Sequence, residues 1–415
     1  MFKIRVLFLL LCSLGFAAEL SLSDCIAAAL SNNETVKIQE LRVEQARAGV
    51  WARTAALLPR LGLNAGYTRM RANTDDYSAA LALEQPLFAG GKYWRDRKLA
   101  LLELRQAELE LAGIKQELAL DVAAAYYRLR RAQGILFANI QSRDNLQDYY
   151  NKSRQLAAQT KLPRPEDLLQ IEIQLGSVEI AVGNAELVWR QAYNLLDNLL
   201  GGLPVKLYKA DEPRDFVFTA APILNIVPPE NAFAKIENNY TLRLAALAEH
   251  QRETAVKSAA AAYWPQINLQ AYSGVEWGET FPQDGANYSQ WGVSLQMLLF
   301  DFFKTPKQIE QNAKAYEQAL LNSELLARNE LIKYSDVLLA LRTAEQKIKL
   351  TAQNMHKAEE SLRLYQERGQ SYTANSKQLL DAEQTALQAK ISQLDSALDY
   401  NLQAVELKRL LGESL

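Results

Sequence analysis

The stretch that decides the fold reads LLPRLGLNAGY at residues 57–67, and its pattern returns as YWPQINLQAY at residues 263–272. Pro59 therefore recurs as Pro265, at an offset of 206 residues. After the proline, both stretches alternate apolar residues with polar or small ones, which is typical of a β-strand with one apolar face. A repeat on this scale predicts that the chain consists of two similar halves.

Further pairs of motifs extend the repeat over almost the whole chain. They recur at offsets of 206 to 212 residues: Asn32-Asn33 with Asn238-Asn239, Leu87-Phe88 with Leu299-Phe300, Leu168-Leu169 with Leu379-Leu380, and Leu199-Leu200-Gly201 with Leu410-Leu411-Gly412. The rise in offset predicts a six-residue insertion, which we place in a turn at residues 278–287. We expect residues 19–201 and 232–415 to be the two structural repeats, with 202–231 as a proline-rich linker between them.

The first 18 residues are typical of a secretory signal peptide. Lys3 and Arg5 precede an apolar segment at residues 6–14, and small residues near Ala17 and Ala18 offer a cleavage site. This segment is too short to span a bilayer as a helix, which takes about 20 residues, and no other apolar run of that length occurs. An N-terminal anchor is the alternative. If the exported chain enters a membrane, we expect it to do so as a β-barrel.

The composition gives little support for catalysis or nucleic-acid binding. The net charge is −2, whereas nucleic-acid-binding domains are strongly basic. His250 and His356 lie outside any spacing typical of a metal site, and no glycine-rich phosphate loop occurs. Cys25 is the single cysteine after the signal, and we expect it to be a small buried side chain. The sequence therefore predicts a protein that is not an enzyme and has no cofactor or metal.

Two proline-free segments predict very long helices. No proline occurs from Leu87 to Leu162 or from Lys307 to Leu415, and apolar residues recur there at spacings of three and four. A helix over residues 93–158 would be about 100 Å long, which favours coiled-coil packing. Breaks at residues 160–165 and 369–375 predict return helices near 167–200 and 377–411, so each half contains a helical hairpin.

Four strands of about ten residues are predicted, two in each half. Each has one apolar face and one polar or small face, as the strands of a transmembrane barrel do. The residues expected to face lipid are Leu61, Leu63, Leu81, Leu83, Leu269, Trp291, Val293 and Leu295. A soluble hairpin with one wet face is the alternative. Because about eight strands are the fewest that close a barrel, strands in lipid require more than one chain.

The predicted fold class is thus mostly α with a β-barrel portion. Duplicated strand pairs and long helical hairpins would form an oligomeric transmembrane β-barrel, continued by a periplasmic α-helical barrel. Long helices standing on the strands would extend the pore away from the membrane by about 100 Å. The product would be a conduit.

The order of these motifs resembles the TolC-type outer membrane efflux protein family. The most specific elements are LLPRL at 57–61, QPLFAGG at 85–91 and LLDAE at 379–383, and the resemblance covers essentially the whole mature chain. It implies a homotrimeric channel-tunnel in the outer membrane of a Gram-negative bacterium, in contact with outer-membrane lipid and extending into the periplasm. It also implies a periplasmic adaptor (membrane fusion) protein and an inner-membrane RND, ABC or MFS transporter as partners. The function implied is passive export of small molecules or polypeptides, in a tripartite efflux or type I secretion system.

The same resemblance implies which residues line the periplasmic aperture. Acidic residues at the start of the return helices line it in the family, and Asp167 and Asp381 match those positions. A further acidic position of the family is Gln378 here, and Tyr372 is a candidate for locking the closed tip. Asp167 is alternatively a charge that complements a helix N-terminus.

The hairpin tips are where the family meets its adaptor. The expected contacts are Leu162, Pro163, Arg164 and Leu379. The leucine pairs at 168–169 and 379–380 are alternatively coiled-coil core, and we expect core for all but one or two of these four leucines.

Two other functions are compatible with the sequence. One is a periplasmic scaffold of helical hairpins that never enters lipid, and the other is a surface receptor that binds through the loop at 278–287. The strands favour the channel, because a soluble scaffold has no need to direct Leu269, Trp291 and Val293 outward together.

Overall fold

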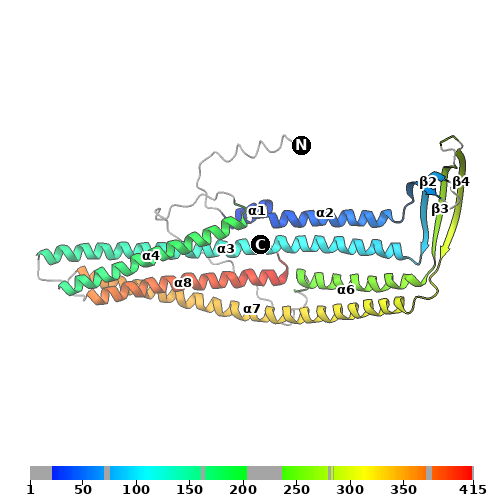
Figure 1. Cartoon of the computed structure of the whole chain (residues 1–415). Helices are drawn as coiled ribbons and strands as arrows, with labels where there is room; N and C mark the ends of the chain where they lie inside the picture. The colour runs from blue at the N-terminus through cyan, green and yellow to red at the C-terminus, as the bar shows by residue number, and fades with distance from the viewer. Residues whose placement is uncertain are drawn as a thin grey trace.

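The computed structural model describes residues 21–69, 75–159, 164–202, 236–278, 282–283, 285–370 and 376–413. The predicted signal peptide, almost all of the predicted linker, and Tyr372, Leu162 and Pro163 lie outside these residues. Figure 1 shows an elongated molecule in which long helices run side by side and a four-stranded sheet occupies one end. The sheet and the tips of the helical hairpins are therefore at opposite ends of the elongated molecule.

Two helices span most of the length of the molecule. Helix α3 (Lys92–Gln159) has 68 residues and α7 (Lys304–Gln370) has 67, so each is about 100 Å long. Helices α4 (Pro165–Leu199) and α8 (Ser376–Leu411) run back along them. The predicted long helices and the two helical hairpins are confirmed.

Shorter helices precede each strand pair. They are α1 (Leu22–Asn32) and α2 (Glu34–Ala55) in the first half, and α6 (Tyr240–Ala259) with the 3-10 turn η2 (Ala260–Tyr263) in the second. The second asparagine of each Asn-Asn pair caps the helix that follows it: Asn33 Oδ1 accepts from Thr35 N at 2.9 Å, and Asn239 Oδ1 accepts from Thr241 N at 2.8 Å. The repeated asparagines therefore mark where α2 and α6 begin.

The end of each return helix meets one of these caps. Asn33 Nδ2 donates to Leu199 O at 3.3 Å, and Asn239 Nδ2 donates to Leu410 O at 3.2 Å. The glycine of the second Leu-Leu-Gly motif, Gly412, has a φ of +69°, and a Cβ there would lie 2.3 Å from Asn238 O. The repeated Asn-Asn and Leu-Leu-Gly motifs are thus two sides of one joint, and α8 and α6 lie in line across it (Figure 1).

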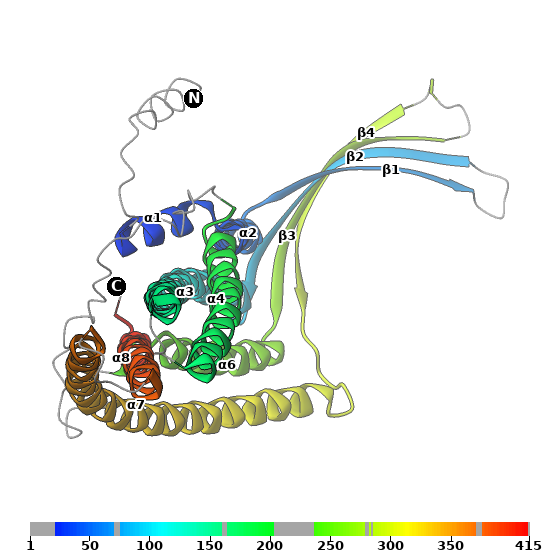
Figure 2. The same cartoon turned by 90° about the vertical axis from the view of Figure 1, so that its left-hand side faces the viewer.

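The sheet is antiparallel, with the strand order β1-β2-β3-β4. Its strands are β1 (Arg60–Arg69), β2 (Asp75–Ala89), β3 (Gln266–Trp277) and β4 (Gly285–Gln296). Strands β2 and β3 join the two halves, and within the described residues β1 and β4 each pair on one side only. Figure 2 shows that the sheet is strongly curved.

The second strand pair corrects one prediction. We placed the six-residue insertion in the turn alone, but β3 has 12 residues where β1 has 10. Some of the inserted residues therefore lengthen the strands, because extra residues in a paired hairpin continue the hydrogen-bond ladder at little cost.

Helix α3 lies at the centre of the helical core, in contact with α1, α2, α4, α6 and α8. Cys25 is fully buried in the cluster that joins α1, α3 and α4, where it packs with Val122 and Leu196, so its predicted role as a small buried side chain is confirmed. Arg131 of α3 pairs with Asp395 of α8 at 2.5 Å, which links the two halves. Among the described helices, none has the length and apolar character needed to cross a membrane.

Candidate functional site

The register of the sheet gathers the apolar strand residues on one face. Directly paired residues of neighbouring strands share a face, and Leu61 pairs with Leu83, Leu83 with Ala271, and Ala271 with Trp291. Odd-numbered strand residues therefore lie on one side, up to the β-bulge between Pro86 and Phe88 of β2, where the alternation shifts by one residue. This side holds the eight residues predicted to face lipid: Leu61, Leu63, Leu81, Leu83, Leu269, Trp291, Val293 and Leu295. Most of them are exposed, Trp291 with 79% of its surface.

The opposite face is polar, small and crowded. Ala80 and Ala82 are buried there, and a Cβ on Gly274 would lie 2.4 Å from Ala79 O and 2.6 Å from Ala80 Cβ. A side chain at residue 274 would therefore collide with strand β2. Figure 2 shows that the sheet is curved, and because residues are buried on the polar face and exposed on the apolar face, we take the polar face as the concave side and the apolar face as the convex side.

At the start of α4, the carboxylate of Asp167 is engaged locally. Its Oδ2 accepts from Arg164 N at 3.2 Å and lies 3.5 Å from the Arg164 guanidinium, and its side chain is 16% exposed. This is the arrangement of a residue that neutralises a helix N-terminus. The structure thus favours the helix-terminal alternative for Asp167, while Arg164 itself is exposed.

At the start of α8, exposed and buried residues alternate in a helical pattern. Gln378 and Asp381 are exposed and lie one turn apart on the same face. Leu379 is only 7% exposed, and Leu380 packs with Leu146 and Ile171 of the first hairpin. Leu379 therefore belongs to the helical core and does not offer the adaptor-contact surface that we predicted for it.

The two leucines at 168–169 differ in exposure. Leu168 is partly buried against the same cluster, whereas Leu169 is exposed. Three of the four leucines are thus core residues, as expected, and Leu169 is the exception.

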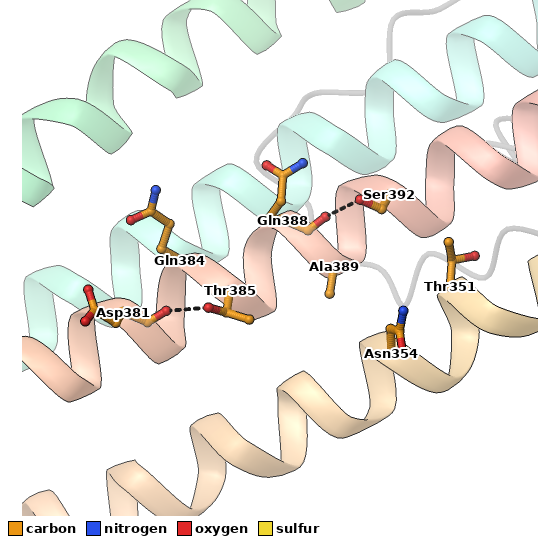
Figure 3. A pocket seen from close by; sticks show the side chains of 8 residues that line it. All are labelled: Thr351, Asn354, Asp381, Gln384, Thr385, Gln388, Ala389 and Ser392. Atoms are coloured by element: carbon orange, nitrogen blue, oxygen red, sulfur yellow. Dashed lines mark hydrogen bonds between the residues drawn. The ribbon is translucent and has the colours of Figure 1, made fainter. Parts of the chain in front are cut away.

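Asp381 lies at one end of an open groove between α7 and α8 (Figure 3). The groove has a volume of about 570 Å³ and is lined by Thr351, Asn354, Asp381, Gln384, Thr385, Gln388, Ala389 and Ser392. Seven of these eight residues are uncharged. The hydroxyls of Thr385 and Ser392 donate to backbone oxygens of α8, at 2.7 and 2.8 Å. Asp381 is the one charged residue among those that line the groove.

Glu383, two residues further along α8, is buried. Burial raises the pKa of its carboxyl group, an effect that the hydrogen bond from Asn145 Nδ2 at 3.3 Å and the charge of Lys390 oppose. We did not predict this residue from the sequence. Its spacing of three to four residues from Leu379 and Leu380 could have indicated it, because residues so spaced share a helix face.

The connections from sheet to long helix hold a second feature that we did not predict from the sequence. Gly90 and Gly91 precede α3 with φ values of +58° and +77°, and Phe302 and Phe303 precede α7 with values of +52° and +66°. The left-handed region costs a residue other than glycine about 1–2 kcal/mol. The offset of 212 residues aligns QPLFAGG at 85–91 with MLLFDFF at 297–303, and this alignment could have revealed the substitution.

In the first half, this connection is closely packed. A Cβ on Gly90 would lie 2.5 Å from Trp264 Cβ, and the ring of Phe88 meets the Trp264 ring edge-on with centroids 6.3 Å apart. In the second half, Phe302 and Phe303 are 83% and 68% exposed, and they contact the ring of Phe300. The connection before α3 is therefore covered by other residues of the same chain, whereas the equivalent connection before α7 is exposed.

Nowhere in the described chain do three or more His, Cys, Asp or Glu side chains come together in a way that could hold a metal ion. His250 lies 3.8 Å from Glu253 on the exposed side of α6, and His356 is exposed on α7.

A family model matches most of the chain, and a curated relative matches less than half of it. The family model described as outer membrane efflux protein matches residues 25–202 and 234–413. The outer membrane efflux protein BepC of Brucella suis biovar 1 (strain 1330) is 26% identical over 207 residues, which is 46% of this chain. The match spans 44% of the length of BepC.

Solved structures match almost the whole chain. The Campylobacter jejuni CmeC outer membrane channel has a TM-score of 0.82 at 17% identity, covering 94% of this chain and 85% of CmeC. The outer membrane protein VceC of Vibrio cholerae has a TM-score of 0.80 at 18% identity, covering 95% of this chain and 96% of VceC. These likenesses confirm the predicted fold class.

Proposed function

Because the chain belongs to the outer membrane efflux protein family, whose members are outer-membrane channels that reach into the periplasm, we propose that it is the exit duct of a tripartite export system. Three copies would form the duct. Solutes would pass through it passively, driven by an inner-membrane transporter to which a periplasmic adaptor protein connects it. The family consists of channels rather than enzymes.

A single observation carries this proposal. One chain supplies a curved sheet that has an apolar convex face, a polar concave face and two edge strands, each of which pairs on one side only within the described part of the chain. An unpaired strand edge is not tolerated in lipid, so a sheet of this kind has to close with other copies. Three copies would bring twelve strands, whose apolar faces would meet lipid and whose polar faces would line the pore.

The dimensions fit a bilayer. A strand of 12 residues, as in β3 and β4, extends for about 40 Å at 3.3 Å per residue. Tilted by about 45°, it spans about 28 Å along the membrane normal, close to the thickness of the hydrocarbon core. The long helices would then extend the duct into the periplasm by about 100 Å.

The hairpin tips are the proposed periplasmic entrance. Asp381 is the best supported aperture residue, because its carboxylate is exposed at the end of an otherwise uncharged groove. Asp167 is less well supported, since Arg164 already neutralises it. Arg164 and Leu169 are exposed at the same end and are the residues we propose for adaptor contact.

The aperture role of Asp381 can be tested by the Asp381→Asn variant in planar bilayers. Three carboxylates at one constriction favour cations, so we expect the variant to lose most of the preference for potassium over chloride. The control is Asp399→Asn, further along α8, where the half-exposed carboxylate pairs with Lys347 at 2.7 Å, and it should leave selectivity unchanged. Equal selectivity of wild type and Asp381→Asn would remove Asp381 from the aperture.

The function as a whole is tested by membrane fractionation with a heat-modifiability gel. We expect a detergent-resistant oligomer of about three times the chain mass in the outer-membrane fraction, which dissociates on boiling. A soluble periplasmic monomer or dimer would refute the duct and would favour a helical scaffold. In that case the convex face of the sheet would have to be covered by protein.

A further inference from the structure

The junction between the two halves shows how two strand pairs of this kind fit together. Strand β2 continues past its pairing with β1 and keeps pairing with β3, through Phe88 with Ile267 and Ala89 with Gln266. Directly beyond this ladder, Trp264 packs over Gly90. We call this region the internal seam, and it joins the end of β2 and start of α3 to the segment that leads into β3.

Among the residues that the structure describes, the corresponding segment of the second half has no such partner. Strand β4 ends at Gln296, where its pairing with Gln266 of β3 ends. The offset of 212 residues makes 297–301 the equivalent of 85–89, the segment of β2 that pairs with β3 alone. Since β3 is the equivalent of β1, the missing partner of 297–301 is a β1 strand, and the β1 strand of the same chain is already at the far edge of the sheet.

From this relation we propose that residues 297–303 of one copy pack against residues 58–61 of the next, in a second version of the internal seam. This contact presupposes the oligomer of the proposed function. By the two offsets, Phe300 lies opposite Leu61, Asp301 opposite Arg60, and Phe302 over Leu58. Figure 2 shows the connection between β4 and α7 standing apart from α6, where a neighbouring copy can reach it.

The residues at the two positions suit each other. Phe300, Phe302 and Phe303 form an exposed aromatic cluster, and Leu58 is exposed as well, so both sides present apolar surface that one chain leaves uncovered. Asp301 and Arg60 carry opposite charges where the internal seam has the neutral pair Ala89 and Gln266. Both differences favour contact between separate copies.

The second seam is wider than the internal one. At the internal seam, Gly90 lets Trp264 approach so closely that a Cβ on residue 90 would lie 2.5 Å from the tryptophan Cβ. Phe302 has the same left-handed backbone but carries a side chain, so the segment with Leu58 has to stand further away. The rings of the aromatic cluster then fill the added space. This gives a reason for keeping two phenylalanines in a backbone conformation that favours glycine.

The test is cross-linking between cysteines in the full chain. In a Cys25→Ala background, the pair Leu58→Cys and Phe302→Cys is treated with a short bismaleimide in isolated outer membranes. We expect covalent dimers and trimers on a boiled denaturing gel. The interface joins two different surfaces, so neither single cysteine variant should form these species. The pair Leu58→Cys and Ile180→Cys, with Ile180 exposed on α4, is the matched negative control.

The outcomes separate this inference from the proposed function. Absence of cross-linked species in a chain that still runs as a detergent-resistant oligomer would overturn the inference alone. A chain that forms no oligomer and stays out of the outer membrane would refute the duct as well. If the aromatic cluster met lipid instead, Phe302→Cys would react with a lipid-soluble maleimide but never link to Leu58→Cys, and that result too would overturn the inference.

A second variant tests the seam without cross-linker. F302G with F303G restores the residues of the internal seam and relieves the backbone of the single chain. We expect the helix content measured by circular dichroism to be unchanged, while the oligomer dissociates at a temperature several degrees lower, because the variant lacks the aromatic rings that fill the second seam. An oligomer as heat-resistant as the wild type would show that the aromatic cluster does not join copies.

Discussion

Replacing Asn239 by alanine removes three hydrogen bonds at the joint between α6 and α8. Asn239 Oδ1 caps α6 at Thr241 N, and Nδ2 donates to Leu410 O and, at 3.0 Å, to Glu330 Oε2. The site is buried, and the side chain of Glu330 is only 5% exposed. Without the amide, Lys333 is left to balance this carboxylate, at 2.6 Å.

The expected cost follows from these partners. Loss of an N-cap costs about 1 kcal/mol. A hydrogen bond to a buried charged group contributes about 1.5–3 kcal/mol, and the orphaned carbonyl of Leu410 adds about 1 kcal/mol. We therefore expect Asn239→Ala to destabilise the fold by about 4 kcal/mol, a severe effect for a single substitution.

The internal repeat supplies a matched control in Asn33→Ala. Asn33 caps α2 at Thr35 N and donates to Leu199 O at 3.3 Å, but it is only partly buried and both of these partners are uncharged backbone groups. We expect a cost of about 1.5 kcal/mol, from the cap and one long hydrogen bond. The free energy of unfolding of both variants is obtained from urea unfolding in mild detergent, with the helix content followed by circular dichroism. The reasoning would be refuted if Asn33→Ala lowered the free energy of unfolding by as much as Asn239→Ala, or by more.

Three further predictions address the tip, the internal seam and the sheet. Burial raises the folded pKa of Glu383 above its unfolded value, so the stability that its protonated form contributes is present below the unfolded pKa and is lost as the pH rises through the folded pKa. Glu383→Gln should therefore flatten the dependence of the unfolding midpoint on pH above the ordinary glutamate pKa; an unchanged slope would contradict this. Gly90→Ala should destabilise the fold by about 1–3 kcal/mol in the same urea assay, because the new Cβ meets Trp264 and the backbone is left-handed; a neutral effect would show that the seam relaxes. Val293→Arg on the convex face should cost about 2–4 kcal/mol and reduce oligomer in the outer membrane, whereas Ser294→Arg on the concave face should be tolerated; equal yields on the heat-modifiability gel would count against lipid contact.

Much of the fold follows from the repeat in the sequence. The offset of 206 residues between Pro59 and Pro265 places β1 and β3, and the proline-free segments give the two long helices. These patterns are local and periodic, so they can be recognised in the sequence without knowledge of tertiary contacts. The boundaries of the two repeats and of the linker stay predictions, because almost all of the linker lies outside the described residues.

The site was less predictable because its features depend on contacts between distant segments. The family resemblance placed both Asp167 and Asp381 at the aperture, but only the structure distinguishes the carboxylate held by Arg164 from that of Asp381, which is exposed beside the groove. Likewise, Leu379 sits in a motif that suggested an exposed contact, and packing within the helical core buries it. The difference between Gly90 and Phe302 becomes meaningful only when the two connections are compared in space.

The joints at Asn33 and Asn239 divide the helices into columns of two kinds, which differ in their mechanics. Helices α3 and α7 are continuous rods, and bending one stretches a ladder of backbone hydrogen bonds along its length. The columns made by α4 with α2 and by α8 with α6 are interrupted, and the backbone ladder there gives way to side-chain hydrogen bonds and packed apolar residues. A sideways force on the hairpin tips would therefore pivot α4 and α8 about these joints before it bends the rods. The duplicated asparagines thus mark the two places where these columns lose the continuous backbone ladder that stiffens α3 and α7.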